Sequence, residues 1–303
     1  MTHIQWTDET WNCVSGCTRI SPGCDHCYIE RTPPFRMAGR RFDGQGIGST
    51  TGVTLHPERL AKPLGWRKPR RVFVNSLADL FHEAVPDEYI VRVYATMAMA
   101  PRHTFQVLTK RPARMRALLS SAEFQGAVQG ARLSQVGLAA AWSRWPLPNV
   151  WAGVSVESQK WADKRIPILA ETPAAVRWLS CEPLLSFVNL QAYLQGIAYG
   201  STAMGLGIGG QMMTWGPGID WVVVGGESGP GARPMDPDWA RSLVEQCRRA
   251  EVPVFVKQLG AVWASDATWN GSPVSHEDKK GGDPFYWPAD LRVREYPAEV
   301  GAQ

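Results

Sequence analysis

The sequence predicts an α/β protein organised around a parallel β-sheet. Six short apolar runs, rich in β-branched residues, recur between residues 71 and 258, and each has about the length of a strand. Helical patterns occupy most of the intervals between them. Such an alternation is typical of a parallel sheet, either open or closed into a barrel. The predicted strands are Arg71–Ser76, Thr104–Thr109, Val150–Val156, Val176–Cys181, Asp220–Gly225 and Val252–Gln258.

The last of the predicted helices has the clearest signals. Asp236 is a favourable N-cap, and Pro237 suits the first helical position. The apolar residues of this segment share one face, so we expect Cys247 to be a buried core thiol. We also expect Cys181 to be structural, because strand alternation turns it toward the helices. The predicted helices are Asp87–Ala100, Pro112–Phe124, Glu157–Ala170 and Pro237–Glu251.

Two stretches interrupt this alternation. An insertion over residues 187–218 is rich in Gly and Met, with the run GLGIGGQMMTWGPG, and we expect a long loop or lid. A C-terminal extension over residues 260–303 is polar, contains Gly and ends in a Pro-flanked tail. The length of the chain fits a single α/β domain over residues 1–303 that carries both additions.

The composition is that of a soluble globular protein, with 303 residues, 44% hydrophobic and 20% charged. The net charge of +4 permits an anionic partner but does not require one. The first residues lack the basic stretch and apolar run of a signal peptide, and no segment has the roughly 18 apolar residues of a membrane span. We therefore expect a cytoplasmic protein without a membrane partner, whose thiols stay reduced.

A cluster of cysteines near the N-terminus is the most informative feature of the chain. Cys17, Cys24 and Cys27 lie within eleven residues, in a loop over residues 12–30 whose Gly and Pro residues favour turns. In a reducing compartment, such spacing favours metal or cluster ligation over disulfides. Three protein thiolates around a [4Fe–4S] cluster leave one iron open, where a small molecule can bind and be activated.

Zinc is the alternative occupant of this loop. It would draw four ligands from a pool formed by Cys13, Cys17, Cys24, Cys27 and His26. Such a site would be structural. The α/β fold predicted for the rest of the chain favours the cluster over zinc, because a cofactor-activating group belongs at the mouth of an α/β sheet lined with charged residues.

Polar side chains follow the carboxyl ends of the predicted strands, where the chemistry of parallel α/β folds collects. Strand alternation places Ser155 and Glu157 on one face, toward the mouth of the sheet. A ring of such groups suits a charged ligand. Its members are Asn75, Ser76, Asp79, Lys110, Ser155, Glu157, Ser180, Glu182, Glu227 and Lys257.

Motifs along nearly the whole chain resemble those of a known protein family. On these motifs the chain is identified as a member of a three-cysteine family, borne by phages and bacteria and named after phage gene products. The family in turn resembles radical S-adenosylmethionine (SAM) enzymes and is similar in layout to spore photoproduct lyase-like proteins, which also carry Thr-Lys after a barrel strand. The motifs are Ile4–Asn12, Gly16–Cys17, Ser21–Tyr28, Phe73–Ser76, Asp79–His82, Leu108–Pro112, Gly153–Glu157, Ser180–Leu184 and Val224–Gly229.

The resemblance implies a partial (β/α) barrel of about six parallel strands with an N-terminal cluster-binding loop. In that superfamily SAM chelates the open iron of a [4Fe–4S] cluster, and the reduced cluster cleaves SAM to a 5′-deoxyadenosyl radical. The implied ligands are Cys17, Cys24 and Cys27, and the implied partners are SAM and an electron donor such as flavodoxin or ferredoxin. One feature departs from the usual pattern. The superfamily commonly separates its cysteines by three residues and then two, whereas this chain has six and then two.

The resemblance also implies roles at the strand ends. Tyr28 and His26 would lie near the cluster, and either of them suits the adenine. Asn75, Ser76 and Asp79 occupy the position that meets the SAM amine in the superfamily, and an anionic Asp79 suits a cation. Lys110 and Arg111 suit the SAM carboxylate or a substrate phosphate.

The remaining polar groups divide between the ribose of SAM and the substrate. Ser155 and Glu157 suit the ribose hydroxyls, whereas Glu182, Glu227, Arg233 and Lys257 are left for the substrate. DNA or RNA is the substrate that analogy with lesion repair favours. A basic rim with an interleaved Trp66 is consistent with it. That rim would combine Arg67, Lys68, Arg70, Arg71, Lys110 and Arg111.

Three functional hypotheses follow from this reading. The chain is a radical SAM enzyme, a cluster-bearing SAM enzyme that transfers a group without a free radical, or a zinc-stabilised nucleic-acid-binding protein without catalysis.

Overall fold

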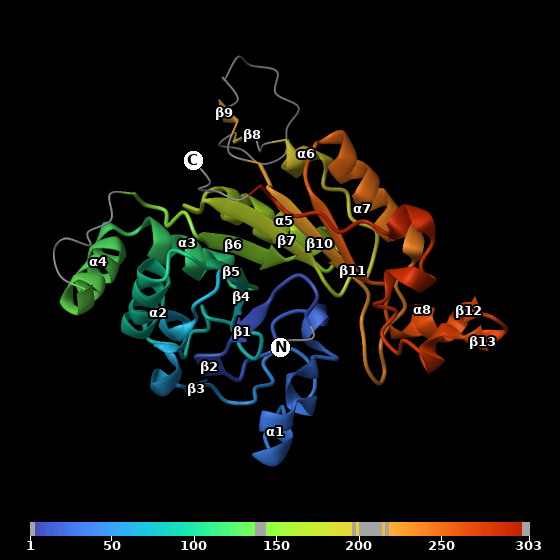
Figure 1. Cartoon of the computed structure of the whole chain (residues 1–303), viewed down its shortest axis with the longest axis horizontal. Helices are drawn as coiled ribbons and strands as arrows, with labels where there is room; N and C mark the ends of the chain where they lie inside the picture. The colour runs from blue at the N-terminus through green and yellow to red at the C-terminus, as the bar shows by residue number, and fades with distance from the viewer. Residues whose placement is uncertain (1–3, 137–143, 196–197, 200–213, 216–217, 299–303) are drawn as a thin grey trace.

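A seven-stranded parallel sheet, curled as a half-barrel, forms the centre of the protein (Figure 1). The computed structural model describes residues 4–136, 144–195, 198–199, 214–215 and 218–298. All six predicted strands are present, and the α/β class is confirmed. In spatial order the strands are β1 (Glu9–Trp11), β4 (Arg71–Val74), β5 (Thr104–Thr109), β6 (Val150–Ser155), β7 (Val176–Cys181), β10 (Trp221–Gly225) and β11 (Val254–Gln258).

The first strand of the sheet was not predicted. Residues Glu9–Trp11 pair in parallel with Arg71–Val74, with Thr10 opposite Phe73. Three residues are too short to show a strand period. This strand matters because it carries the chain directly into the cysteine loop at the carboxyl edge of the sheet.

Helices cover the outer face of the sheet, and their apolar faces pack against it to form the larger core. The N-cap prediction is confirmed, since the Asp236 carboxylate accepts a hydrogen bond from the backbone N–H of Asp238 at 2.9 Å. Cys181 and Cys247 are fully buried, as expected. The helices are α2 (Asp87–Met99), α3 (Pro112–Ser120), α4 (Ala122–Val136), α5 (Gln159–Ala170) and α7 (Pro237–Arg249).

One predicted helix is divided in two. The prediction of a continuous helix over Pro112–Phe124 is wrong, because α3 ends at Ser120 and α4 begins at Ala122. Ser121 adopts an extended conformation, with φ of −77° and ψ of 124°. Its hydroxyl accepts a hydrogen bond from the N–H of Phe124 at 3.2 Å, which caps the new helix.

The inner face of the sheet carries a second, aromatic core. Trp6 packs edge-on against Phe73 and Trp178, with ring centroids 4.7 and 5.2 Å away. Trp221 extends the group and stacks on Tyr296 at 5.6 Å. These rings fill the floor of the half-barrel, so the space above them is bounded by apolar surface.

The C-terminal extension returns to the edge of the sheet. It contains α8 (Ala261–Asp266) and the paired strands β12 (Thr268–Trp269) and β13 (Ser272–Pro273). Beyond them, the N–H of Val256 donates to the carbonyl oxygen of Val293 at 2.9 Å. This contact covers edge strand β11, which would otherwise present unpaired backbone groups.

Short elements complete the described chain. Most of the predicted lid at 187–218 lies outside the described residues, apart from segments that include α6, β8 and β9. Within the described residues, no helix combines the length and apolarity needed to cross a membrane. The short elements are β2 (Val14–Ser15), β3 (Thr54–Leu55), β8 (Ala198–Tyr199), β9 (Thr214–Trp215), α1 (Pro33–Met37), α6 (Gln191–Leu194) and 3₁₀ turns at Pro22–Cys24, Tyr28–Arg31, Pro57–Arg59, Lys62–Gly65, Val274–His276, Pro284–Tyr286 and Ala289–Leu291.

Candidate active site

A cavity of about 690 Å³ opens where the strands end, above the aromatic floor. This volume is in the range of sites for small molecules and cofactors. Every predicted site residue except Glu157 lines it. Those that do are Cys17, Cys24, Cys27, Tyr28, Asn75, Ser76, Asp79, Lys110, Ser155, Glu182 and Glu227.

The three cysteines of the loop border this cavity together. The N–H of Cys24 donates to the carbonyl oxygen of Ser21 at 2.9 Å, and the N–H of Cys27 donates to that of Cys24 at 3.2 Å. Burial raises the pKa of the Cys17 thiol to about 12, and the nearby Asp79 carboxylate adds to the rise. Burial also raises the pKa of Cys27.

Cys13 is placed apart from the other three thiols. It is fully buried, does not line the cavity, and its Sγ donates to the Asn75 Oδ1 at 3.5 Å. Within the part of the chain that the structure describes, no three His, Cys, Asp or Glu side chains form a group suited to one metal ion. A [4Fe–4S] cluster binds each thiolate on a different iron, so its three sulfurs do not converge on a single metal ion. The donor set of Cys17, Cys24 and Cys27 fits that arrangement.

Asp79 joins the loop after β4 to the end of β5. Its Oδ1 accepts hydrogen bonds from the Thr109 hydroxyl at 2.7 Å and the Phe81 N–H at 3.0 Å. Its Oδ2 accepts from the Lys110 N–H at 3.0 Å and the Arg111 Nη1 at 3.2 Å. A carboxylate has about four acceptor sites, and all are used here. Asp79 therefore positions its neighbours, with no acceptor site left for the SAM amine.

Arg111 extends from Asp79 to the cysteine loop. Its Nη1 lies 3.9 Å from the Cys17 Sγ, and its Nη2 donates to the Thr18 carbonyl oxygen at 3.4 Å. A third contact runs from its Nε to the Glu83 carboxylate at 2.9 Å. A guanidinium beside a sulfur stabilises the thiolate, which is the form that binds metal.

Glu157 lies beneath the cysteine loop rather than in the cavity. It is 1% exposed, and its Oε2 accepts from the Arg165 Nη1 at 2.7 Å. A Cβ on Gly23 would lie 3.1 Å from the Glu157 Cδ, so the loop rests directly on this carboxylate. The expected contact with a ribose is therefore replaced by support of the loop.

Lys110 and Ser155 lie side by side in the wall of the cavity. The Lys110 Nζ donates to the Ser155 Oγ at 3.2 Å. Burial acts to lower the pKa of Lys110, but the charges of Cys24 and Glu157 outweigh it and the pKa lies above its usual value. Lys110 is thus held as a cation beside the cysteines.

Tyr28 and Asn75 form another part of the wall. The Tyr28 ring is 47% exposed, and its hydroxyl donates to the Ser76 carbonyl oxygen at 2.5 Å. Asn75 has a φ of 61°, is 2% exposed, and its Oδ1 accepts from the Val14 N–H at 3.0 Å. Its Nδ2 is buried and has no partner within the described chain, so it is a donor available to a ligand.

The loop after β10 closes over the cysteine loop; we call these contacts the clasp, formed between residues 22–31 and 227–233. Arg233 donates to both oxygens of Glu227, at 2.7 and 3.0 Å, and to the Pro22 carbonyl oxygen at 2.9 Å. It also pairs with Asp25 at 3.4 Å. The Arg31 Nη2 donates to the carbonyl oxygen of Pro230 at 3.2 Å.

In the wall of the same cavity, Glu182 and Lys257 form an ion pair. The Lys257 Nζ lies 2.8 Å from the Glu182 Oε1, and the Trp6 indole N–H donates to the Glu182 Oε2 at 3.3 Å. The sequence suggested both charged residues from their positions at strand ends, but it did not indicate their pairing or the role of Trp6.

The predicted basic rim does not form. Arg70 and Arg71 lie at the amino end of β4, whereas Lys110 and Arg111 follow the carboxyl end of β5. Arg70 pairs with Glu9 at 3.2 Å, and Arg71 pairs with Asp8 at 3.3 Å. Parallel strands place these two sets of cations at opposite edges of the sheet.

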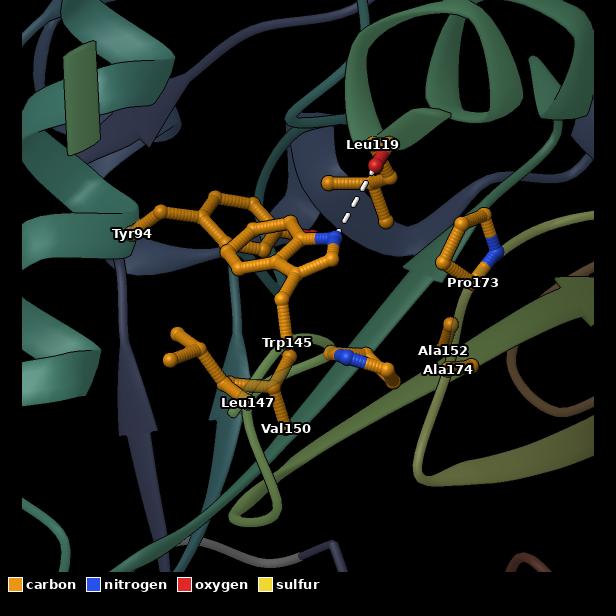
Figure 2. Close-up of a pocket in the computed structure, with 9 residues that line it drawn as sticks. Tyr94, Leu119, Trp145, Leu147, Val150, Ala152, Pro173 and Ala174 are labelled. Carbon is orange, nitrogen blue, oxygen red and sulfur yellow. Dashed lines mark hydrogen bonds between the residues drawn. The ribbon is translucent and has the colours of Figure 1, made fainter. Parts of the chain in front are cut away.

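A second cavity lies in the outer core, far smaller than the first (Figure 2). It measures about 10 Å³, room for about one water molecule. Tyr94, Trp145 and Leu147 are among its largely apolar walls, and the Trp145 indole N–H donates to the Leu119 carbonyl oxygen at 3.0 Å. It is a packing defect rather than a ligand site.

Comparison with known proteins identifies the family alone. No curated protein and no solved structure matches the chain. A family model with the description "Protein of unknown function (DUF5131)" matches residues 1–285. This agrees with the resemblance along nearly the whole chain, while the relation to radical SAM enzymes stays a prediction. The chain belongs to the DUF5131 family.

Proposed function

We propose that this chain is an enzyme that holds a [4Fe–4S] cluster on Cys17, Cys24 and Cys27 and uses SAM. The observation that carries the proposal is that all three thiols border one cavity of about 690 Å³ at the carboxyl ends of the strands. That edge of a parallel sheet is where cofactors and substrates bind in α/β enzymes. A closed structural site would have no need of such a cavity.

The cysteine side of the cavity offers groups that suit SAM. The unpartnered Asn75 Nδ2 and the Lys110 ammonium are donors for the methionine carboxylate. The hydroxyls of Ser76 and Ser155 suit the ribose, and the exposed Tyr28 ring offers a face to adenine. Asp79 would not contact SAM itself. It orients Arg111 toward the Cys17 sulfur.

The cluster, once reduced by a donor such as flavodoxin or ferredoxin, would supply the electron that splits SAM into methionine and a 5′-deoxyadenosyl radical. The chain's own contribution is placement and exclusion of water. The floor formed by Trp6, Phe73 and Leu108 is apolar and lies below the cysteines and the charged strand ends. The rest of the cavity would hold the substrate, for which a nucleic acid is our proposal.

The test is an anaerobic assay of SAM cleavage. The native chain, reconstituted with iron and sulfide and reduced with dithionite, is expected to convert SAM to 5′-deoxyadenosine. Cys27→Ser should abolish the product, whereas Cys13→Ser, which alters a buried thiol outside the cavity, should retain it. A different fragment of SAM would favour group transfer without a free radical. A protein that binds zinc and leaves SAM intact would refute the proposal.

A further inference from the structure

The cavity also contains an ion pair that is not among the groups proposed to hold the cluster or SAM. Glu182 follows β7 and Lys257 lies on β11, so the two residues flank β10 from either side. Their side chains are 13% and 21% exposed, and both border the cavity. A carboxylate and an ammonium therefore face the same space, next to one another.

The pair keeps hydrogen-bonding capacity for a ligand. Each oxygen of Glu182 uses one of its two acceptor sites, for Lys257 at 2.8 Å and for Trp6 at 3.3 Å. Lys257 has three N–H donors and uses one of them in this pair. A Cβ at Gly225 would lie 2.6 Å from the Glu182 Oε1, so the glycine is what allows the carboxylate to rest against β10.

Among the four nucleobases, the hydrogen-bonding groups of the pair match one. Two acceptor oxygens beside a cationic donor match two adjacent N–H donors beside an acceptor. Guanine presents this order on its Watson–Crick edge, with N1–H and N2–H next to O6. Uracil, cytosine and adenine each present a single donor group there, so none of them fills both oxygens of Glu182 and also accepts from Lys257.

Apolar residues below the ion pair and cations at the mouth of the cavity suit the other parts of a nucleotide. Trp6 and Phe73 line the cavity but are 2% and 8% exposed, so they supply an apolar floor for a base rather than an open ring face. At the rim, Lys280 is exposed and borders the cavity, as does Arg31. Cations at the mouth of a base-binding cavity suit the phosphate of the same nucleotide. The acidic Glu227 at this rim is already neutralised by Arg233, at 2.7 Å.

We infer that the part of the cavity around Glu182 and Lys257 binds a guanine nucleotide, free or as an extruded base of a nucleic acid. Glu182 accepts from N1–H and N2–H, Lys257 donates to O6, and Lys280 contacts the phosphate. The inference rests on the proposed function, because it names the substrate class of the same cavity. Recognition itself needs no cluster, so the two can fail separately.

The test is equilibrium binding of the four ribonucleoside monophosphates to the full chain by calorimetry. We expect GMP to bind at least about tenfold more tightly than AMP, CMP or UMP, because a mismatched base leaves buried polar groups unpaired. Equal affinity for the four nucleotides, or binding of none, would overturn the inference. A single-stranded oligonucleotide with one guanine, compared with GMP, distinguishes a nucleic-acid source from a free nucleotide.

Variants assign the preference to the named residues. Glu182→Gln replaces one acceptor by a donor and should reduce the preference for GMP to less than about threefold, and Lys257→Met should weaken GMP more than AMP. Lys280→Ala should weaken GMP but not guanosine. Lys279→Ala is the matched control, since Lys279 does not line the cavity and should leave GMP binding unchanged. A Glu182→Gln chain that keeps the full preference would refute the assignment.

Repeating the nucleotide-binding measurement after iron has been removed with a chelator separates the proposed guanine site from the proposed SAM reaction. If GMP still binds selectively but SAM is never cleaved, the proposed reaction fails and the recognition site stands. If SAM is cleaved but GMP shows no preference, the recognition site fails alone.

Discussion

The Arg233 guanidinium donates a hydrogen bond to the Pro22 carbonyl oxygen at 2.9 Å, although the two residues are 211 positions apart in sequence. Pro22 begins the 3₁₀ turn that contains Cys24, and Arg233 is also bound to Glu227 after β10. This contact therefore ties the cysteine loop to the opposite side of the sheet. The position of the three thiols relative to the rest of the cavity depends on it.

Removal of Arg233 should loosen the cysteine loop. Arg233→Ala is expected to lower the free energy of unfolding by about 3 kcal/mol, the lower end for a buried pair, because the guanidinium is 28% exposed. Iron retained after gel filtration should fall as well. Arg241→Ala is the control, because Arg241 is a surface residue of α7 with carboxylate partners outside the cavity. Equal iron retention in the two variants would show that the clasp does not hold the loop.

The clasp should also respond to acid in a defined direction. Burial acts to raise the pKa of Glu227, but hydrogen bonds from Arg233 outweigh it, so the pKa lies below its ordinary value of 4.5. A group whose pKa is lower in the folded state stabilises the fold above the unfolded pKa, and loses that effect as the pH falls through the folded pKa. The stability difference between native protein and Glu227→Gln should thus be constant above about pH 5.5 and shrink below 4.5. Urea unfolding across this range measures it, and a difference that grows toward acid pH would contradict the assignment.

A side chain at Gly23 should destabilise the cysteine loop. A Cβ at this position would lie 3.1–3.3 Å from Glu157, which is held by Arg165 at 2.7 Å and is unable to move freely. Gly23→Ala is expected to cost about 1–2 kcal/mol and to reduce iron incorporation, because it lifts the loop that carries Cys24. Gly65→Ala is the matched control, since no atom lies within 4 Å of its added Cβ. The test compares the thermal unfolding and the iron content of the two variants. The same stability and iron content in both would mean that Glu157 does not support the loop.

Arg111 should influence the reduction potential of the bound cluster. Its guanidinium lies 3.9 Å from the Cys17 Sγ, where a cation favours the more negative, reduced state. Arg111→Met is expected to shift the midpoint potential to more negative values, whereas Arg111→Lys should shift it less. Spectroscopic redox titration measures the shift, and Arg116→Met, at an exposed position on α3, serves as the control. An unchanged potential in Arg111→Met would show that this cation does not act on Cys17.

The sequence predicted the strands, most helices and most of the cavity wall, because apolar runs and the polar residues that follow them are local signals. It missed β1, which is three residues long, and the break at Ser121, where a single hydroxyl starts a new helix. It also could not show that the carboxylates of Asp79 and Glu157 accept hydrogen bonds from arginine side chains. Those pairings depend on how Arg111 and Arg165 fold back, and strand periodicity carries no such information.

The clasp was even harder to predict from the sequence. Its contacts join residues about two hundred positions apart, and no local pattern marks Arg233 as a partner of Pro22. The same holds for the placement of Trp6 beneath Glu182, 176 positions away. Such contacts arise only once the sheet has curled and its two sides approach one another.

The most direct test of the central claim is elemental analysis of the anaerobically purified chain. The account predicts about four irons and four acid-labile sulfides per chain. It predicts loss of both in Cys24→Ser and retention in Cys13→Ser, since Cys13 lies outside the cavity. One zinc ion per chain without sulfide, or equal loss of iron in the two variants, would contradict it.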